Sequence, residues 1–99
     1  MTTKQDLSVE NKVAVVTGAN RGIGLALVKE LLDRGVHRVY AAGRDTAGLE
    51  RVVALDRNRV VPLQLDLLDP KQIARAAAET GPVHLLINNA GVARFRQHP

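Results

Sequence analysis

The chain has 99 residues, enough for one domain at most, and 45% of them are hydrophobic, as in an ordinary globular protein. The absence of cysteine excludes disulfides and thiolate metal sites, and we expect no other metal site because the three histidines lie far apart in the sequence. The formal charge is +4, but we predict no nucleic-acid partner, because basic residues are interspersed with acids and only 2% of residues are aromatic.

Residues 1–11 are predicted to form a polar tail. They include charged side chains and lack the apolar core of a signal peptide. No stretch approaches the ~20 apolar residues of a membrane-spanning helix. We therefore expect a cytoplasmic protein with no membrane partner.

A strand and a helix are predicted to follow this tail. Residues 13–17 (VAVVT) are apolar and mostly β-branched, a pattern typical of a strand buried on both faces. The helix is expected from Gly22 to Arg34, with Gly35 ending it in a left-handed conformation. Its apolar face is predicted to consist of five side chains at helical spacing: Ile23, Leu27, Val28, Leu31 and Leu32.

A second strand is predicted at residues 37–42, followed by a helix that Asp45 or Thr46 can cap and that runs to about residue 55. A third strand is predicted at residues 59–65 and contains Pro62. Because proline cannot donate a hydrogen bond to a neighbouring strand, we expect this strand at an edge of the sheet.

The third helix begins with a capping sequence. Asp69 can accept hydrogen bonds from free amides, Pro70 suits the first helical position, and Gln72 can reach back to the helix start. The helix is expected to end near residue 79, where a Gly-Pro pair follows, and a fourth strand is predicted at residues 83–87. Residues 88–99 have no clear periodicity.

The resulting order, β-α-β-α-β-α-β, predicts an α/β fold. Strands joined through helices are parallel, and such crossovers are right-handed. The strand order 3-2-1-4 would place the strand that contains Pro62 on the outside. We therefore expect a Rossmann-type, doubly wound parallel sheet that is partial, with four strands.

Residues 17–24 (TGANRGIG) join the first strand to the first helix. In a Rossmann-type fold this turn presents backbone amides and the positive end of a helix to a diphosphate. Gly18 permits the tight turn, Gly22 lets the backbone approach the phosphates, and Gly24 allows the helix to lie close to the sheet. An ordinary turn with surplus glycine is the alternative. The turn lacks the Lys-Ser/Thr ending of a P-loop, which disfavours a nucleotide triphosphatase.

The turn resembles the cofactor turn of short-chain dehydrogenases/reductases, and two further motifs of that family follow. Asp66-Leu67, after the third strand, resembles the acid that accepts from the adenine amino group. Asn88-Asn89-Ala90-Gly91, after the fourth strand, resembles the N-N-A-G motif beside the adenosine ribose. The resemblance covers residues 12–93 and implies a truncated NAD(P)-binding Rossmann domain there, with residues 94–99 as an irregular tail.

Carried over residue by residue, the resemblance implies that the cofactor is bound by two groups of residues: Thr17, Gly18, Asn20, Arg21, Gly22, Ile23, Gly24 and Arg44, and Asp66, Leu67, Asn89, Ala90 and Gly91. Two of these residues have structural alternatives. Asp66 could serve only as a turn residue after its strand. Asn88 and Asn89 could satisfy loop backbone groups, with Asn89 the better candidate for the ribose.

The end of the second strand bears on the choice of cofactor. An acid there would bind the ribose hydroxyls of NAD and repel a 2′-phosphate. This sequence has Gly43 at that position, followed by Arg44, as in NADP-dependent members of the family that it resembles. Arg21 is a second basic residue on the same side. We therefore predict NADP(H) in preference to NAD(H).

The family resemblance implies that the catalytic residues lie outside these 99 residues. The family depends on a serine and a Tyr-x-x-x-Lys pair, but the only tyrosine here is Tyr40, and Arg rather than Lys stands at position 44. We expect no catalytic residue and no activity in this chain alone, and a homo-oligomeric parent protein. The fourth strand is expected to be an exposed apolar edge.

Two functions therefore remain. The first is the cofactor-binding portion of an NADP-dependent oxidoreductase that interconverts a carbonyl and a secondary alcohol as its small-molecule substrates. The alternative is a non-catalytic nucleotide-binding or sensing fragment. A methyltransferase is disfavoured because Gly43 and Arg44 leave no acid for the ribose of its cofactor.

Overall fold

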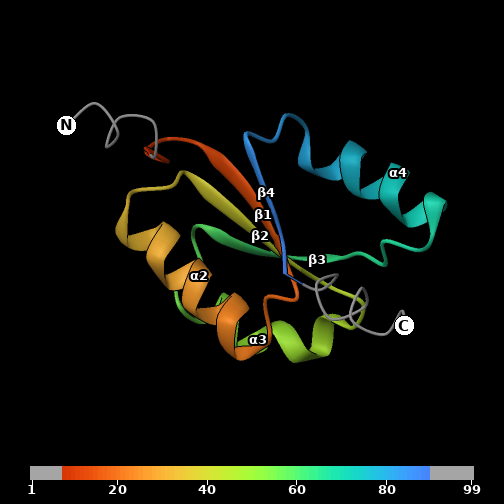
Figure 1. Ribbon diagram of the computed structural model, residues 1–99, viewed down its shortest axis with the longest axis horizontal. Helices are drawn as coiled ribbons and strands as arrows, with labels where there is room; N and C mark the ends of the chain where they lie inside the picture. Colours follow the sequence, from red (N-terminus) through yellow and green to blue (C-terminus); the bar gives the residue numbers. More distant parts are fainter. Residues whose placement is uncertain (1–7, 90–99) are drawn as a thin grey trace, which may run out of the picture.

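The computed structural model describes residues 8–89 and contains one four-stranded sheet with helices on both faces (Figure 1). The chain alternates strand and helix throughout. In order, the elements are β1 (Val13–Thr17), α2 (Gly22–Asp33), β2 (Arg38–Gly43), the 3-10 helix η1 (Thr46–Leu49), α3 (Glu50–Val53), β3 (Val60–Gln64), α4 (Pro70–Thr80) and β4 (Leu85–Asn88).

The sheet has the order β3-β2-β1-β4 with all neighbouring pairs parallel. This confirms the predicted α/β class and the 3-2-1-4 order. Pro62 lies in β3 at one edge, where its missing N–H is tolerated. Because the strands are parallel, their carboxyl ends all lie at one edge of the sheet, which we call the carboxyl edge.

The core has two parts, one on each face of the sheet. Figure 1 shows α2 and α3 on one face and α4 on the other. The side chains of Ala14 and Val16 point to the first face and pack with buried residues of α2 and α3, such as Val28 and Val52. On the second face the side chain of Val15 belongs to a smaller cluster of buried residues: Val15, Tyr40, Ala42, Leu63 and Ala76. Apart from Tyr40, the buried residues of these two clusters are aliphatic.

The apolar face of α2 differs from the prediction at its first residue. Ile23 is 70% exposed, whereas Gly24, Val28 and Leu31 are buried. The inner face begins at Gly24, because only a residue without a side chain fits where the helix meets the preceding turn. The predicted inward position of Ile23 is therefore wrong.

The second helical region is shorter and less regular than the single helix predicted up to residue 55. Asp45 caps it as expected, with its Oδ1 accepting from the amide of Ala47 at 3.0 Å. The first turn is 3-10, and the α-helical part is only Glu50–Val53. Gly48 and the β-branched pair Val52 and Val53 all lower helix propensity, which accounts for the difference.

The start of α4 confirms two of its three predicted capping interactions. The Oδ1 of Asp69 accepts from the amide of Lys71 at 3.0 Å, and Pro70 is the first helical residue. Gln72 reaches further back than predicted, and its Oε1 accepts from the amide of Asp66 at 2.9 Å. Gln72 therefore braces the end of the β3 segment rather than the helix start.

The strand β4 forms the second edge of the sheet among residues 8–89. It begins at Leu85 rather than Val83, because the ring of His84 accepts a hydrogen bond from the amide of Val13 in place of a backbone partner. Leu86 is 61% exposed on this strand. The predicted exposed apolar edge is therefore confirmed for the described part of the chain. Within that part, no helix combines the length and apolarity needed to cross a membrane.

Arg59 ties the end of α2 to the start of β3. Its guanidinium donates to the backbone oxygens of Leu32 and Val36 at 3.3 and 3.0 Å and pairs with the carboxylate of Asp56 at 2.9 Å. Hydrogen bonds from the Arg59 side chain and from the backbone amides of Asn58 and Arg59 hold the pKa of Asp56 below its usual value of 3.8. A lowered pKa in the folded state means that the ionised carboxylate stabilises the fold.

We expect the free energy of unfolding to fall with decreasing pH in a way that depends on Asp56. The stabilisation is fully present above the carboxyl's usual pKa and is lost as the pH falls through the lower pKa of the folded state. Asp56→Asn should therefore reduce stability at pH 7 and flatten this part of the profile. Urea unfolding between pH 2.5 and pH 7 measures it. A profile for Asp56→Asn equal to that of the unmodified chain would contradict the assignment.

Candidate functional site

The candidate site is the turn between β1 and α2 at the carboxyl edge of the sheet. Two backbone hydrogen bonds fix its course: the amide of Ala19 donates to the oxygen of Ala42 at 3.4 Å, and the amide of Arg21 donates to the oxygen of Gly18 at 3.1 Å. The turn thus leaves β1, contacts the end of β2, and enters α2 at Gly22.

The three glycines of the turn meet different surroundings. Gly18 has a φ of 63°, in the left-handed region that favours glycine. A Cβ on Gly24 would lie 2.2 Å from the oxygen of Gly18, so only glycine fits there. Apart from its two chain neighbours and the backbone of α2, a Cβ on Gly22 would have no atom of the described chain within 4 Å. Gly22 therefore leaves open space above the turn, although the fold itself does not require a glycine at this position.

The start of α2 has no side-chain cap. Its N-cap residue is Arg21, whose side chain makes no capping hydrogen bond, and its first turn contains no acid. By contrast, η1 and α4 are capped by Asp45 and Asp69. The free amides and the positive end of the helix dipole at Gly22 thus face a space suited to an anion.

The carboxyl end of β4 braces the turn from the side. The Oγ1 of Thr17 lies 2.8 Å from the Oδ1 of Asn88, and the Nδ2 of Asn89 donates to the oxygen of Gly18 at 3.3 Å. Asn89 thus has the structural role considered from the sequence, because it satisfies a backbone group of the turn, whereas Asn88 contacts a side chain. Thr17 is buried and joins β1 to β4.

Asp66 lies after β3 at the same edge of the sheet. Its Oδ1 accepts from the amide of Leu68 at 2.9 Å, so it forms the turn that was the alternative interpretation. The turn uses one carboxylate oxygen only. Gln72 fixes the backbone of Asp66, and Leu67 beside it is 40% exposed. Asp66 and Leu67 are therefore held in place at the edge with groups still accessible to a ligand.

The two candidate arginines are both exposed. Arg21 is at the entry of α2, and Arg44 directly follows β2. The backbone at Arg44 is held by Gln64, whose Nε2 donates to its carbonyl oxygen at 3.4 Å. Neither guanidinium has an ion pair with an acid among residues 8–89, so both can meet a negative charge outside the chain.

Gly48 is a site residue that the sequence did not point to. A Cβ at this position in η1 would lie 3.0 Å from the Nδ2 of Asn20, which belongs to the glycine turn. The missing side chain of Gly48 therefore leaves room for Asn20. A single glycine in a predicted helix was the only sign of it in the sequence.

The structure thus brings the predicted residues that it describes together at the carboxyl ends of β1, β2, β3 and β4. Ala90 and Gly91, also predicted to bind the cofactor, lie outside the described residues. No group of three or more metal-binding side chains is present within residues 8–89. The combination of an uncapped helix start, open space at Gly22 and two accessible arginines fits an elongated ligand with phosphate groups.

Comparison with known proteins gives a consistent result. Residues 12–99 match the family profile described as short chain dehydrogenase. Mouse retinol dehydrogenase 11 is 44% identical over 96 residues, covering 88% of this chain and 30% of its own length. The chain spans about a third of the length of the curated relatives that it matches.

Two solved structures show the same architecture. A short chain dehydrogenase from Burkholderia cenocepacia in complex with NADP is 44% identical, with a TM-score of 0.74 over 85% of this chain and 34% of its own. NADPH-bound carbonyl reductase from chicken fatty liver is 36% identical, with a TM-score of 0.72 over 85% of this chain and 36% of its own.

Proposed function

Because this chain belongs to the short-chain dehydrogenase family, we propose that it is the NADP(H)-binding portion of an oxidoreductase that interconverts a carbonyl and a secondary alcohol. The observation that carries the proposal is the uncapped start of α2 beneath the open space at Gly22. A diphosphate placed there would accept hydrogen bonds from the free amides and gain from the helix dipole.

The preference for NADP(H) rests on the two exposed arginines. Gly43 leaves no carboxylate at the end of β2, and Arg44 follows it directly. A guanidinium can form a bidentate, charge-assisted pair with a phosphate. Arg44 and Arg21 would hold the 2′-phosphate from two sides. The NADP- and NADPH-bound relatives are consistent with this assignment.

The other residues would position the rest of the dinucleotide. Asp66 would accept from the adenine amino group through the carboxylate oxygen that its turn leaves available, with Leu67 beside the ring. Asn89 would keep the oxygen of Gly18 occupied, so that the turn presents N–H groups rather than oxygens to the phosphates. Bound nicotinamide dinucleotide supplies a hydride in reduction and accepts one in oxidation.

The chemical step belongs to residues that these 99 do not include. Tyr40 is buried in β2, its ring packs in the core beneath α4, and Arg44 rather than lysine stands four residues later. We therefore propose that this chain binds the cofactor without catalysing hydride transfer. Substrate contacts and assembly into a homo-oligomer would come from the parent protein.

We expect NADPH to bind to the chain and NADH to bind at least tenfold more weakly, because one charge-assisted hydrogen bond to the 2′-phosphate is worth about 1.5–3 kcal/mol. Titration followed by the fluorescence of the reduced nicotinamide measures both affinities. No oxidation of NADPH should occur with a simple aldehyde or ketone. Equal affinities would refute the cofactor assignment, and rapid carbonyl-dependent oxidation would refute the proposed lack of activity.

A further inference from the structure

The pairing between β1 and β4 is stabilised at its amino end by a histidine side chain. The amide of Val13 donates to the Nδ1 of His84 at 3.0 Å, and the amide of His84 donates to the oxygen of Val13 at 2.9 Å. The ring thus takes the place of a backbone acceptor for the first amide of β1. Because Nδ1 accepts, the neutral ring carries its proton on Nε2.

The strand β4 is held mainly by this pairing. Within residues 8–89 its only strand neighbour is β1, and none of its four residues is buried. The other edge strand of the described part, β3, is also packed into the core through the buried side chains of Val60 and Leu63. A hydrogen bond between β1 and β4 therefore matters more for the position of β4 than a comparable bond does for β3.

The far end of β4 braces the glycine turn. The pairing that starts beside His84 ends where Asn88 lies opposite Thr17. The next residue, Asn89, donates from its Nδ2 to the oxygen of Gly18 at 3.3 Å. A displacement of β4 relative to β1 would move both asparagines. The bond at the start of β4 is therefore linked through this strand to the turn.

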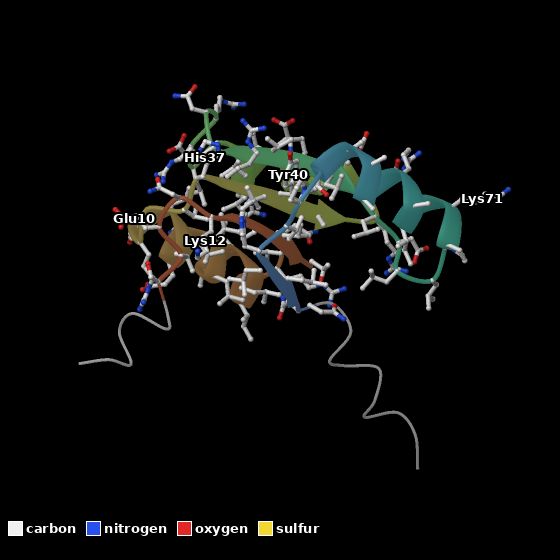
Figure 2. The ribbon with its side chains drawn as sticks, turned by 90° about the horizontal axis from the view of Figure 1, so that it is seen from above. Glu10, Lys12, His37, Tyr40 and Lys71 are labelled. Atoms are coloured by element: carbon white, nitrogen blue, oxygen red, sulfur yellow. The ribbon has the colours of Figure 1, made fainter. Side chains whose placement is uncertain are left out.

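His84 is exposed and lies at a hollow open to water. The other polar residues lining this hollow come from before β1, from β2 and the residue before it, and from the end of α4: Asn11, His37, Arg38, Tyr40 and Thr80. Of these, Arg38 is charged, and His37 and Tyr40 are titratable. Figure 2 shows His37 at this end of the molecule, far from Lys71 at the start of α4.

The negative charge that faces this hollow is small. The carboxyl end of α4 contributes only the partial charge of a helix end, and no carboxylate is among the described residues that line the hollow. A protonated His84 would therefore have no acid to pair with there in place of its bond to Val13.

We propose that His84 positions the glycine turn through β4, and that it does so only while its ring is neutral. Histidine ordinarily takes up a proton between about pH 5 and pH 8. A proton on Nδ1 would replace the acceptor with a donor that faces the amide of Val13, so the hydrogen bond would be lost. The stabilisation is thus present at high pH and is lost as the ring becomes protonated. For NADP(H) binding, this inference rests on the function proposed above.

Hydrogen exchange of the 15N-labelled chain without cofactor tests the bond to Val13. His84→Asn is the matched variant, because its Oδ1 is as many bonds from the backbone as Nδ1 and accepts without titrating. Both proteins should protect the Val13 amide equally at pH 7.5. At pH 5.5 the unmodified chain should protect it about two- to tenfold less than His84→Asn, the factor for one hydrogen bond. Comparison at the same pH cancels the effect of pH on exchange itself.

The amide of Arg21, which donates to the oxygen of Gly18, reports on the turn in the same experiment. Its protection should fall at pH 5.5 in the unmodified chain and not in His84→Asn. His37→Asn, which changes the other histidine at this hollow, should behave like the unmodified chain. If His84→Asn fails to fold, His84→Asp offers the same acceptor and stays ionised over this pH range.

Calorimetric titration with NADP+, the cofactor form that is stable in acid, measures the effect on binding. Between pH 7.5 and pH 5.5 the unmodified chain should lose about two- to tenfold more affinity than His84→Asn. The 2′-phosphate itself takes up a proton near pH 6, as phosphate monoesters do. That contribution is common to both proteins, so the ratio of their losses isolates His84.

The proposal is wrong if the unmodified chain and His84→Asn lose protection at Val13 in parallel, because the titrating group would then lie elsewhere. It is also wrong if Val13 responds and neither the Arg21 amide nor the NADP+ affinity follows, because His84 would then hold the strand without positioning the turn. Absence of NADP+ binding at pH 7.5 in every variant would refute the proposed function instead. The amide of Arg21 would still decide the role of His84.

Discussion

Replacing Gly24 with alanine is expected to unfold the chain or to destabilise it by at least about 3 kcal/mol, the upper range for inserting a group into a closely packed site. The added Cβ would lie 2.2 Å from the oxygen of Gly18 and 2.8 Å from the Cα of Ala19. Both are backbone atoms, so no side chain can move aside to relieve the clash. Either the turn or the whole of α2 must shift. Thermal and urea unfolding followed by circular dichroism measure the loss.

Gly22→Ala is the matched control, two residues earlier in the same turn. Beyond its chain neighbours and the backbone of α2, its Cβ would meet no atom of residues 8–89, so stability should be unchanged or higher by about 0.4–1 kcal/mol through reduced freedom of the unfolded chain. The same methyl group would occupy the space proposed for the diphosphate. NADPH affinity should therefore fall at least tenfold in a folded protein. Full NADPH affinity in Gly22→Ala would contradict the proposed path of the diphosphate.

Arg44→Asp is expected to reverse the preference between the two cofactors. The substitution removes a charge-assisted hydrogen bond of about 1.5–3 kcal/mol, a factor of about ten to a hundred in affinity, and places a like charge near the 2′-phosphate. For NADH the new carboxylate offers an acceptor to the ribose hydroxyls. NADPH affinity should fall more than tenfold, while NADH affinity is maintained or rises. Parallel titrations of both cofactors measure the ratio.

Arg57→Asp is the charge-matched control, because Arg57 is exposed in the turn before β3 and precedes the strand rather than following it. It makes the same change in net charge at the other end of the sheet. Its ratio of NADPH to NADH affinity should equal that of the unmodified chain. An unchanged ratio in Arg44→Asp would show that the 2′-phosphate, if bound, is recognised elsewhere.

The topology of the sheet could be predicted because several independent signals agreed. Alternating β-branched runs and helical stretches give the parallel class, and Pro62 restricts its strand to an edge. The caps Asp45 and Asp69 were predictable because an N-cap acts on the amides that follow it within the next turn. These signals are local in the sequence and do not depend on how the layers pack.

The incorrect predictions concern positions at which tertiary packing determines which side chain is buried or which group it contacts. Ile23 and Gly24 are neighbours, and an apolar pattern alone favours burying the isoleucine. In the fold, the close approach of α2 to Gly18 selects glycine for the inner position. The hydrogen bond between Gln72 and Asp66 was missed for a similar reason, and so was the room that Gly48 leaves for Asn20. Such contacts join separate elements, so the local apolar pattern does not determine their geometry.

The bracing of the glycine turn has a consequence for the order of events during synthesis. The contacts from Thr17 to Asn88 and from Asn89 to Gly18 each span 71 residues. When a ribosome has released the chain only as far as β3, the residues of the turn have been synthesised. Asn88 and Asn89, which hold the turn, have not. Cofactor binding should therefore begin only after β4 has emerged and added to β1, which makes the dinucleotide a reporter of the pairing between these two strands.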